Sequence, residues 1–269
     1  FEHTMEMLEE FRRHVIIEKP TFMRPDQLVE AYARADELGL GLFPVFQNRY
    51  NKAVRRVKLA LDSGELGEVR TVSVRLRWCR PQRYYDLAPW RGTFSHDGSA
   101  LTNQTIHHVD LLRHLGGAVE RVNATMRTLG AEIEVEDTTA ASFVYASGAL
   151  GTLEATTAAR PDDFEASISF VCANGLAQIG GIALNKIDTW FFVNEEAADQ
   201  TVAANYSEEV PTGYGLGHIP MLRDIVGCLD EGKNEPPISA EDAVAAVDIV
   251  HALYSSIEQN SWVSLADKP

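Results

Sequence analysis

Residues His14–Pro20 read His-Val-Ile-Ile-Glu-Lys-Pro, an apolar β-branched run that ends at a carboxylate, an ammonium group and a proline. A continuous Val/Ile run is typical of a parallel strand that is covered on both faces. Open α/β sheets bind ligands beyond the carboxyl ends of such strands, so the run predicts that Glu18 and Lys19 lie at a ligand site. An edge strand followed by a solvated turn explains the same residues equally well, because Glu-Lys-Pro is a common tripeptide.

Charge and composition exclude several classes of partner. The chain has 24 Lys and Arg against 39 Asp and Glu, a net charge of −15. This charge repels a polyanion, so nucleic acid is not an expected partner, although a local pocket with Lys and Arg can still hold a small anion. We expect no membrane partner and a cytoplasmic location, because no apolar stretch approaches the roughly 20 residues of a membrane helix and no signal peptide opens the chain. The three cysteines are odd in number and far apart, which favours buried apolar roles over disulfides or a metal site.

The first 68 residues alternate between helical and strand patterns. Apolar residues at helical spacing predict a helix within residues 1–12 and another from Pro25 to Gly39. The Val/Ile run at 15–17 and a second run over Leu40–Phe46 predict strands, and a third helix covers Ala53–Leu61. Helix, strand, helix, strand is half of a doubly wound parallel sheet, so this region is predicted to be α/β.

The pattern changes at residue 69. Apolar and polar residues alternate from Val69 to Arg77, as in a half-buried antiparallel strand. Further strands are predicted over Glu120–Met126, Thr138–Tyr145, Gly151–Thr157, Phe164–Cys172, Ala177–Gly180 and Thr189–Val193. Two helices close the chain, Pro220–Leu229 and Ala240–Gln259, with Ser239 as the predicted N-cap of the second. Residues 69–269 are therefore predicted to form an α+β domain with a large, mostly antiparallel open sheet.

One predicted helix of this second region, Ser99–Leu115, carries a polar stripe. At about 100° per residue, Asn103, His107, Asp110 and His114 fall on one side of it. A polar stripe is usually a solvated face, and on the helix pattern alone we favour that interpretation.

Glu18-Lys19-Pro20 together with the spacing Gly98-x-x-x-x-Asn103-x-x-x-His107-x-x-Asp110 resembles the Gfo/Idh/MocA family of NAD(P)-dependent sugar and cyclitol oxidoreductases. The resemblance runs over nearly the whole chain. It implies that residues 1–68 are the C-terminal part of a dinucleotide-binding (Rossmann) domain and that 69–269 form a substrate-binding and oligomerisation domain. It also implies a homodimer or homotetramer and NAD or NADP as cofactor, with NAD favoured.

The same resemblance implies roles for individual residues. Lys19 and His107 are the expected catalytic pair, and which of them is the base stays open. Glu18 is expected near the nicotinamide ribose. Many family members have aspartate four residues before the histidine, where this chain has Asn103. An asparagine can orient a histidine but cannot stabilise its imidazolium electrostatically.

Four segments are similar to the dehydrogenases of this family that oxidise C3 of UDP-N-acetylglucosaminuronate. They are Tyr84-Tyr85-Asp86, Trp90-Arg91-Gly92-Thr93, Asn103-Gln104-x-Ile106-His107 and Gly217-His218. Trp90 and Arg91 are candidates for cofactor or substrate contacts, because an indole packs on planar rings and a guanidinium pairs with carboxylate or phosphate. Tyr84, Tyr85, Asn103 and His218 are candidates for substrate binding. For each, ordinary packing or surface contacts remain the alternative.

The Gly-x-Gly-x-x-Gly turn that holds the pyrophosphate in this family is not found before the Glu-Lys-Pro strand, where about two βα units would precede it. We therefore expect this chain to be a fragment that lacks half of its cofactor site. Two other functions stay open: a dehydrogenase of a free sugar or cyclitol, and a non-catalytic binding or assembly scaffold of the same fold.

Overall fold

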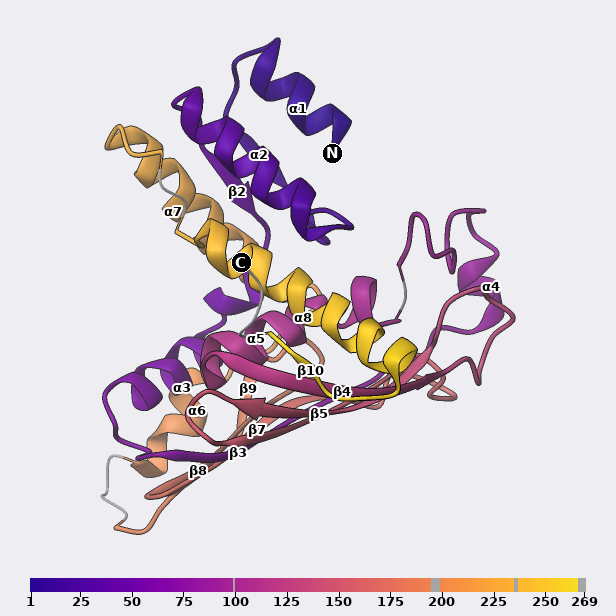
Figure 1. Cartoon of the computed structure of the whole chain (residues 1–269). Coiled ribbons are helices and arrows are strands. Elements are labelled where there is room, and N and C mark those ends of the chain that lie inside the picture. The colour runs from indigo at the N-terminus through magenta and orange to yellow at the C-terminus, as the bar shows by residue number, and fades with distance from the viewer. Residues whose placement is uncertain (99, 195–198, 235–236, 266–269) are drawn as a thin grey trace.

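The computed structural model describes residues 1–98, 100–194, 199–234 and 237–265. Its strands form two sheets, one of two strands and one of eight. Figure 1 shows the large sheet at the bottom of the molecule and helices α5 (Ile106–Gly116) and α8 (Ala240–Gln259) on its upper face. The small sheet and helix α2 (Pro25–Glu37) form a third layer above these helices. The layers follow the predicted order of an α/β region and a second region with a large sheet.

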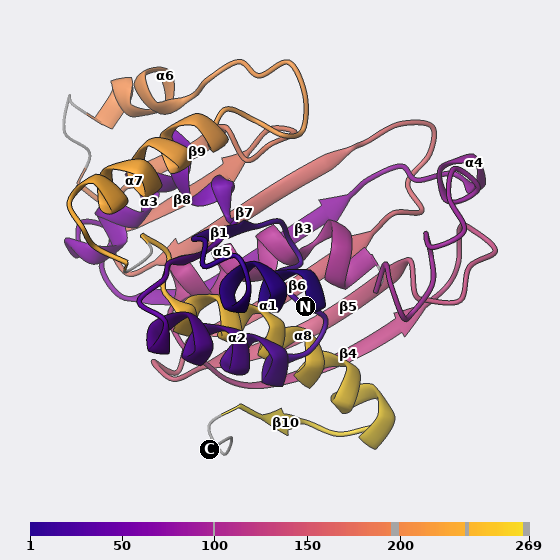
Figure 2. The same cartoon turned by 90° about the horizontal axis from the view of Figure 1, so that it is seen from above.

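The small sheet consists of β1 (Val15–Ile17) and β2 (Leu42–Pro44), which pair in parallel. Helix α1 (Glu2–Glu9) precedes β1, and α2 connects the two strands. Pro25 occupies the first turn of α2. Backbone N–H groups in the first turn have no acceptor within the helix, so the N–H that proline lacks costs no hydrogen bond there. Seen from above, α1 and α2 lie over α8 (Figure 2). The predicted parallel α/β arrangement is confirmed.

The prediction that β1 is covered on both faces is wrong. Ile16 is 48% exposed, and its neighbours Val15 and Ile17 are only half-buried. Successive side chains of a strand point to opposite faces, and the face that carries Ile16 is open. Among the described residues β1 pairs with β2 alone, so it has a free edge as well. β2, in contrast, is buried along its whole length.

The large sheet has the strand order β10-β4-β5-β6-β3-β7-β8-β9. β3 is parallel to β6, and all the other recorded pairings are antiparallel, which confirms the predicted mostly antiparallel sheet. The strands are β3 (Val69–Arg77), β4 (Val119–Arg127), β5 (Thr138–Tyr145), β6 (Leu150–Thr156), β7 (Glu165–Cys172), β8 (Gly175–Gly180), β9 (Lys186–Phe192) and β10 (Val263–Ser264).

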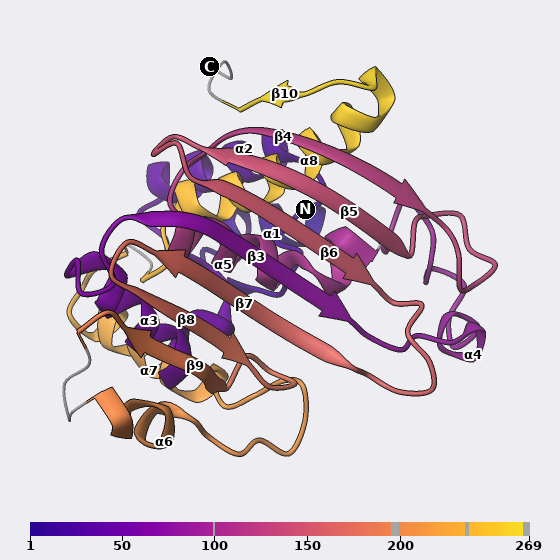
Figure 3. The same ribbon diagram turned by 90° about the horizontal axis from the view of Figure 1, so that it is seen from below.

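Among the described residues, helices cover one face of this sheet and leave the other open. Val72, Val74 and Leu76 of β3 alternate with exposed or half-exposed polar residues and are buried beneath the helical layer. Seen from below, strands β4 to β7 have no described helix in front of them (Figure 3). The alternation that predicted half-buried strands therefore reflects a sheet with one core face and one open face.

The remaining helices lie at the edges of these layers. They are α3 (Lys52–Asp62), α4 (Gln82–Tyr85), α6 (Val202–Tyr206) and α7 (His218–Asp230), with 3-10 turns at Gln47–Tyr50 and Asp199–Thr201. Ser239 caps α8 as predicted, because its Oγ accepts from the backbone N–H of Asp242 at 3.1 Å. No helix among the described residues is long and apolar enough to cross a membrane.

Candidate active site

Lys19 follows the end of β1, and its amine reaches the turn that precedes α5. Nζ donates to the backbone oxygen of Asn103 at 2.8 Å and to Asn103 Oδ1 at 2.9 Å. Burial lowers the pKa of Lys19 from its ordinary value of 10.5, while the charges of Glu18 and Asp97 act in the opposite direction and that of Arg80 lowers it. A lysine with a lowered pKa can lose its proton and act as a base nearer neutral pH.

The turn that carries Asn103 is not the start of a regular helix. The sequence predicts one helix over Ser99–Leu115, of which Ser99 lies outside the described residues. In the structure Ala100–Gln104 form a π-helical turn, and α5 begins after it. Thr105 explains the break, since its N–H and its Oγ1 each donate to the carbonyl of Ala100 at 2.9 Å. A bond across five residues widens the turn, and such turns are frequent at functional sites. The predicted regular start of this helix is wrong.

His107 lies in the first turn of α5. Its ring packs edge-on against Phe46, with 6.0 Å between ring centroids, and its Nδ1 is buried without a hydrogen-bond partner among the residues that the structure describes. Burial lowers the pKa of His107 well below 6.5, and the positive charge of Lys19 adds to this effect. His107 is therefore neutral near pH 7, with one ring nitrogen that a ligand can still engage.

Lys19 and His107 line the same cavity, which has a volume of about 1140 Å³. Typical ligand pockets have volumes of about 300–1,000 Å³. Asn103 and Gln104 from the π-helical turn and Gln47 from the segment after β2 also line it. Side chains from both sheets' regions thus meet at one site, which is large enough for a ligand bigger than a monosaccharide.

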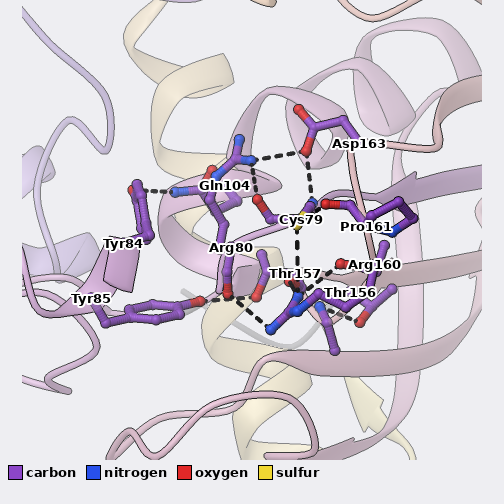
Figure 4. Close-up of polar contacts among 12 residues, drawn as sticks. Cys79, Arg80, Tyr84, Tyr85, Gln104, Thr156, Thr157, Arg160, Pro161 and Asp163 are labelled. Atoms are coloured by element: carbon purple, nitrogen blue, oxygen red, sulfur yellow. Dashed lines mark hydrogen bonds and ion pairs between the residues drawn. The ribbon is translucent and has the colours of Figure 1, made fainter. Parts of the chain in front are cut away.

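One wall of the cavity alternates guanidinium groups with aromatic rings. The guanidinium carbon of Arg91 lies 4.3 Å from the ring centroid of Tyr84 and 4.6 Å from that of Trp90. Arg80 lies 5.5 Å from the Tyr84 centroid and donates to Asp163 Oδ1 at 2.9 Å, and the Tyr84 hydroxyl accepts from Gln104 Nε2 at 3.1 Å (Figure 4). Arg91 Nε is buried without a partner. This wall offers stacked, positively charged donors to an anionic ligand.

Three residues proposed from the sequence do not line this cavity. Tyr85 is buried, and its hydroxyl shares a 2.9 Å hydrogen bond with Thr157 Oγ1 instead (Figure 4). Glu18 is exposed, and its carboxylate accepts from the N–H of Lys19 at 3.2 Å. His218 is the first residue of α7 and is half-buried. Tyr85 therefore does not face this cavity, Glu18 and His218 flank it, and the role of all three in ligand binding stays a prediction.

Sequence reasoning missed two polar residues of the site. Asp97 is 5% exposed, and one of its carboxylate oxygens accepts from Asn103 Nδ2, next to the Lys19 contact. Gln47 is 4% exposed, and its Oε1 has no partner. Gln47 follows a parallel strand just as Lys19 does, so the strand-end argument could have found it. No pattern in the sequence marked Asp97.

The predicted polar stripe has an upper half, Asn103 and His107, and a lower half, Asp110 and His114. At Asp110 the lower half is not a solvated face. Asp110 is 2% exposed and accepts two hydrogen bonds from Arg49, at 2.8 and 2.5 Å. Arg49 also donates to Asp242 at 2.8 Å, and Arg113 donates to the same carboxylate at 2.5 Å. These four residues form an ion-pair cluster between α5, α8 and the turn after β2, in which Arg49 and Asp110 are buried and Arg113 and Asp242 are partly exposed. The interpretation of this part of the stripe as solvated is wrong because charged partners from other elements cover it.

Comparisons with known proteins assign the chain to one family. Residues 54–178 match the model of the GFO/IDH/MocA C-terminal domain. The WlbA dehydrogenase from Bordetella pertussis, solved in complex with NADH and UDP-GlcNAcA, is 35% identical with a TM-score of 0.90, over 98% of this chain and 76% of that chain. This chain belongs to the Gfo/Idh/MocA family. The recognition made from Lys19, Asn103 and His107 is confirmed.

Other members of the Gfo/Idh/MocA family show the same similarity. The WlbA dehydrogenase from Chromobacterium violaceum, also in complex with NADH and UDP-GlcNAcA, is 33% identical with a TM-score of 0.88, over 99% of this chain and 75% of that chain. The myo-inositol 2-dehydrogenase of Thermotoga maritima is 24% identical over 95% of this chain and 74% of its own length. These relatives are dehydrogenases. No group of three or more His, Cys, Asp or Glu suited to a metal ion occurs among the described residues.

Proposed function

We propose that this chain acts in an NAD(P)-dependent dehydrogenase that oxidises a hydroxyl group of a nucleotide sugar, with C3 of UDP-N-acetylglucosaminuronate as the first choice. The observation that carries the proposal is a single cavity lined by Lys19 and His107 and by three arginines, Arg80, Arg83 and Arg91. The similarity to two WlbA dehydrogenases bound to NADH and UDP-GlcNAcA supports the choice of substrate.

Lys19 is the proposed base. Oxidation of a hydroxyl to a carbonyl releases a proton together with a hydride, and a nicotinamide cofactor supplies the hydride acceptor when bound. Burial lowers the pKa of the Lys19 amine from 10.5, which lets it lose its proton more readily, and lowers the pKa of His107 well below 6.5, which keeps its ring neutral. These two shifts support Lys19 as the residue that takes the proton and His107 as a neutral group that orients the hydroxyl.

The arginine wall supports an anionic substrate. Among the described residues Arg83 and Arg91 have no carboxylate within ion-pair distance, so both are available to a ligand; Arg80 is already paired with Asp163. A UDP-linked uronic acid brings a pyrophosphate and a carboxylate, and guanidinium groups pair with both. Free sugars and cyclitols have neither group and leave these charges unused. Trp90 and Tyr84 provide planar surfaces beside Arg91.

The residues present fit the nicotinamide end of a dinucleotide. The carboxyl ends of the parallel strands β1 and β2 place Lys19 and Gln47 at one edge of the small sheet, where α/β folds bind nucleotides. The unpartnered buried oxygen of Gln47 is an acceptor suited to an amide such as that of nicotinamide. Lys19 and Gln47, with Trp90 and Arg91 across the cavity, are the residues that would hold this end.

We also propose that residues 1–68 and 69–269 act as separate domains. We further propose that copies of the chain associate as a homodimer or a homotetramer. The open face of the large sheet carries exposed apolar side chains at Leu150, Val171, Leu176 and Phe191. Val171, Leu176 and Phe191 lie opposite one another on adjacent strands, and exposed apolar side chains that are grouped in this way favour burial against a second copy. Light scattering on the purified protein tests this, and a monomer at micromolar concentration would contradict it.

The experiment that tests the function is a comparison of NADH formation by the complete gene product with three substrates. We expect UDP-N-acetylglucosaminuronate to have a far higher kcat/KM than free glucuronate or myo-inositol, because binding of the remote nucleotide helps to orient the reacting hydroxyl. A higher value with a free sugar or myo-inositol would assign a free-sugar dehydrogenase. Absence of turnover with all three, and of cofactor binding, would favour the scaffold function.

A further inference from the structure

Asp97 forms a chain of contacts that ends at the proposed base. Its Oδ1 accepts from Asn103 Nδ2, and Asn103 Oδ1 accepts from Lys19 Nζ at 2.9 Å. Its Oδ2 accepts from the backbone N–H of Gly92 at 2.7 Å, which fixes the carboxylate itself. Asp97 is 5% exposed, so the carboxylate at the start of these contacts is buried, while Asn103 and Lys19 line the cavity.

The chemistry of these groups allows one orientation of the Asn103 amide. A carboxylate can only accept hydrogen bonds, so it requires the NH2 side of the amide. The amide oxygen then faces Lys19, whose amine needs an acceptor. Without the carboxylate the amide could rotate by 180° and present two N–H donors to the lysine, and donors facing an amine do not hold it in place.

The orientation matters because of how a neutral amine is built. Deprotonated Lys19 has two N–H bonds and one lone pair. The backbone oxygen and Oδ1 of Asn103 lie at 2.8 and 2.9 Å from Nζ and can accept both N–H groups. The lone pair is then free to point elsewhere, toward a hydroxyl whose proton it can take. Both acceptors come from Asn103, so the direction of the lone pair depends on the orientation of that amide.

We propose that Asp97 is a positioning residue for the dehydrogenase reaction, which acts through the Asn103 amide to direct the Lys19 amine at the substrate hydroxyl. The inference rests on the proposed role of Lys19 as the base. In this chain the carboxylate reaches the lysine through an amide.

Several charged groups surround Lys19 and set the direction of the expected pH effect. The negative charges of Glu18 and Asp97 favour its protonated form, and the positive charge of Arg80 disfavours it. Lys19 and His107 also act on each other, since the lysine charge lowers the pKa of the histidine. Removal of the charge of Asp97 should therefore lower the pKa of Lys19 and move the ascending limb of the pH–rate profile to lower pH.

The test is Asp97→Asn in the complete gene product. We expect kcat to fall on the order of 10- to 100-fold, as misplacement of a reacting group does, and the ascending limb of kcat against pH to move to lower pH. Asp224→Asn is the matched control, because it removes a carboxylate that is 52% exposed and paired with Arg55 at the surface. It should change neither kcat nor the limb. A loss of rate with an unmoved limb would assign Asp97 a merely structural role.

A second measurement does not depend on catalysis. Lysine labelled with carbon-13 at the ε position reports the pKa of Lys19 by NMR, and Lys19→Met assigns its signal. We expect a lower Lys19 pKa in Asp97→Asn and a higher one in Asn103→Asp, which brings a carboxylate into direct contact with the amine. If both shifts occur without dehydrogenase activity, the proposed function fails and the contact chain stands. If the enzyme is active and neither variant moves the Lys19 pKa, the inference is overturned.

Discussion

The two halves of the polar stripe at α5 have similar sequences and different surroundings. In the upper half, His107 Nδ1 is buried with no partner, and the ring lines a large cavity. In the lower half, both oxygens of Asp110 accept hydrogen bonds from Arg49. A buried polar group whose bonding capacity is complete holds elements together, whereas one that is unsatisfied at a cavity is available to a ligand. The difference lies in the partners, which other elements supply.

The largest expected effect concerns the upper half. Lys19→Met should lower kcat about 10²- to 10⁴-fold, the contribution typical of a general base, with the free energy of unfolding unchanged or slightly higher because a buried amine is removed. Steady-state kinetics and urea unfolding measure the two quantities. Lys52→Met, at a side chain that is 58% exposed, is the control and should keep full activity. Near-normal turnover of Lys19→Met would show that Lys19 is structural.

The lower half should respond in stability instead. Arg49→Leu leaves the carboxylate of Asp110 buried without its partner, and breaking a buried ion pair costs about 3–5 kcal/mol. Urea unfolding should show this loss. Arg34→Leu removes a guanidinium that pairs with Glu9 and Glu37 on the surface, where water screens the charges, so its unfolding midpoint should hardly change. Equal losses in the two variants would contradict the distinction between the clusters.

His108 tests whether a missing partner alone marks a functional residue. Both of its ring nitrogens are buried and unpartnered, but it packs against Trp78 and does not line the cavity. Burial lowers its pKa from 6.5 to about 4. Between these values the unfolded state binds more protons, so stability should be lost as the pH falls from 6.5 to 4, by up to about 3 kcal/mol.

His108→Phe removes this titration and should keep dehydrogenase activity. The measurement is the free energy of unfolding at several pH values between 4 and 7, and its slope should be shallower in the variant than in the unmodified protein. An identical slope, or a large loss of kcat, would mean that His108 shares the role of His107.

The smallest effect is expected at the end of the ion-pair cluster. Ser239→Ala removes the N-cap of α8 and should lower the free energy of unfolding by about 1 kcal/mol. Its bond partner is the N–H of Asp242, which pairs with Arg49 and Arg113. Combined with Arg49→Leu, the loss should be less than the sum of the two single losses, because both act on Asp242. Strict additivity would show that the cap and the cluster are independent.

The hydrophobic periodicity, together with the residues that begin and end elements, predicted the long helices and strands well. The alternation over Val69–Arg77 and the helical pattern of Ala240–Gln259 match β3 and α8 at both ends. The short elements α4, α6 and β10 were missed because too few positions exist to show a period, whereas the three-residue strands β1 and β2 were found from their apolar runs. The exposure of Ile16 was missed for another reason: a strand's composition does not reveal which of its faces is covered.

The site was predicted in part. Motif spacing brought Lys19, Asn103 and His107 together, and the structure places all three at one cavity. Adjacent tyrosines could not be distinguished, although Tyr84 lines the cavity and Tyr85 bonds to Thr157, because α4 turns them to different sides. Asp97 and Arg49 could not be found from spacing, since their partners are distant in sequence or lie across an irregular turn.

The bond between Lys19 and Asn103 joins residues that are 84 positions apart. Contacts of such separation form late, because the chain loses loop entropy before the contact compensates for it. Local helices and hairpins can therefore form in a refolding chain before Lys19, the proposed base, reaches its contact with Asn103. During refolding, enzymatic activity would then recover after secondary structure. The time course of recovered turnover would therefore report when the small sheet docks onto the large one.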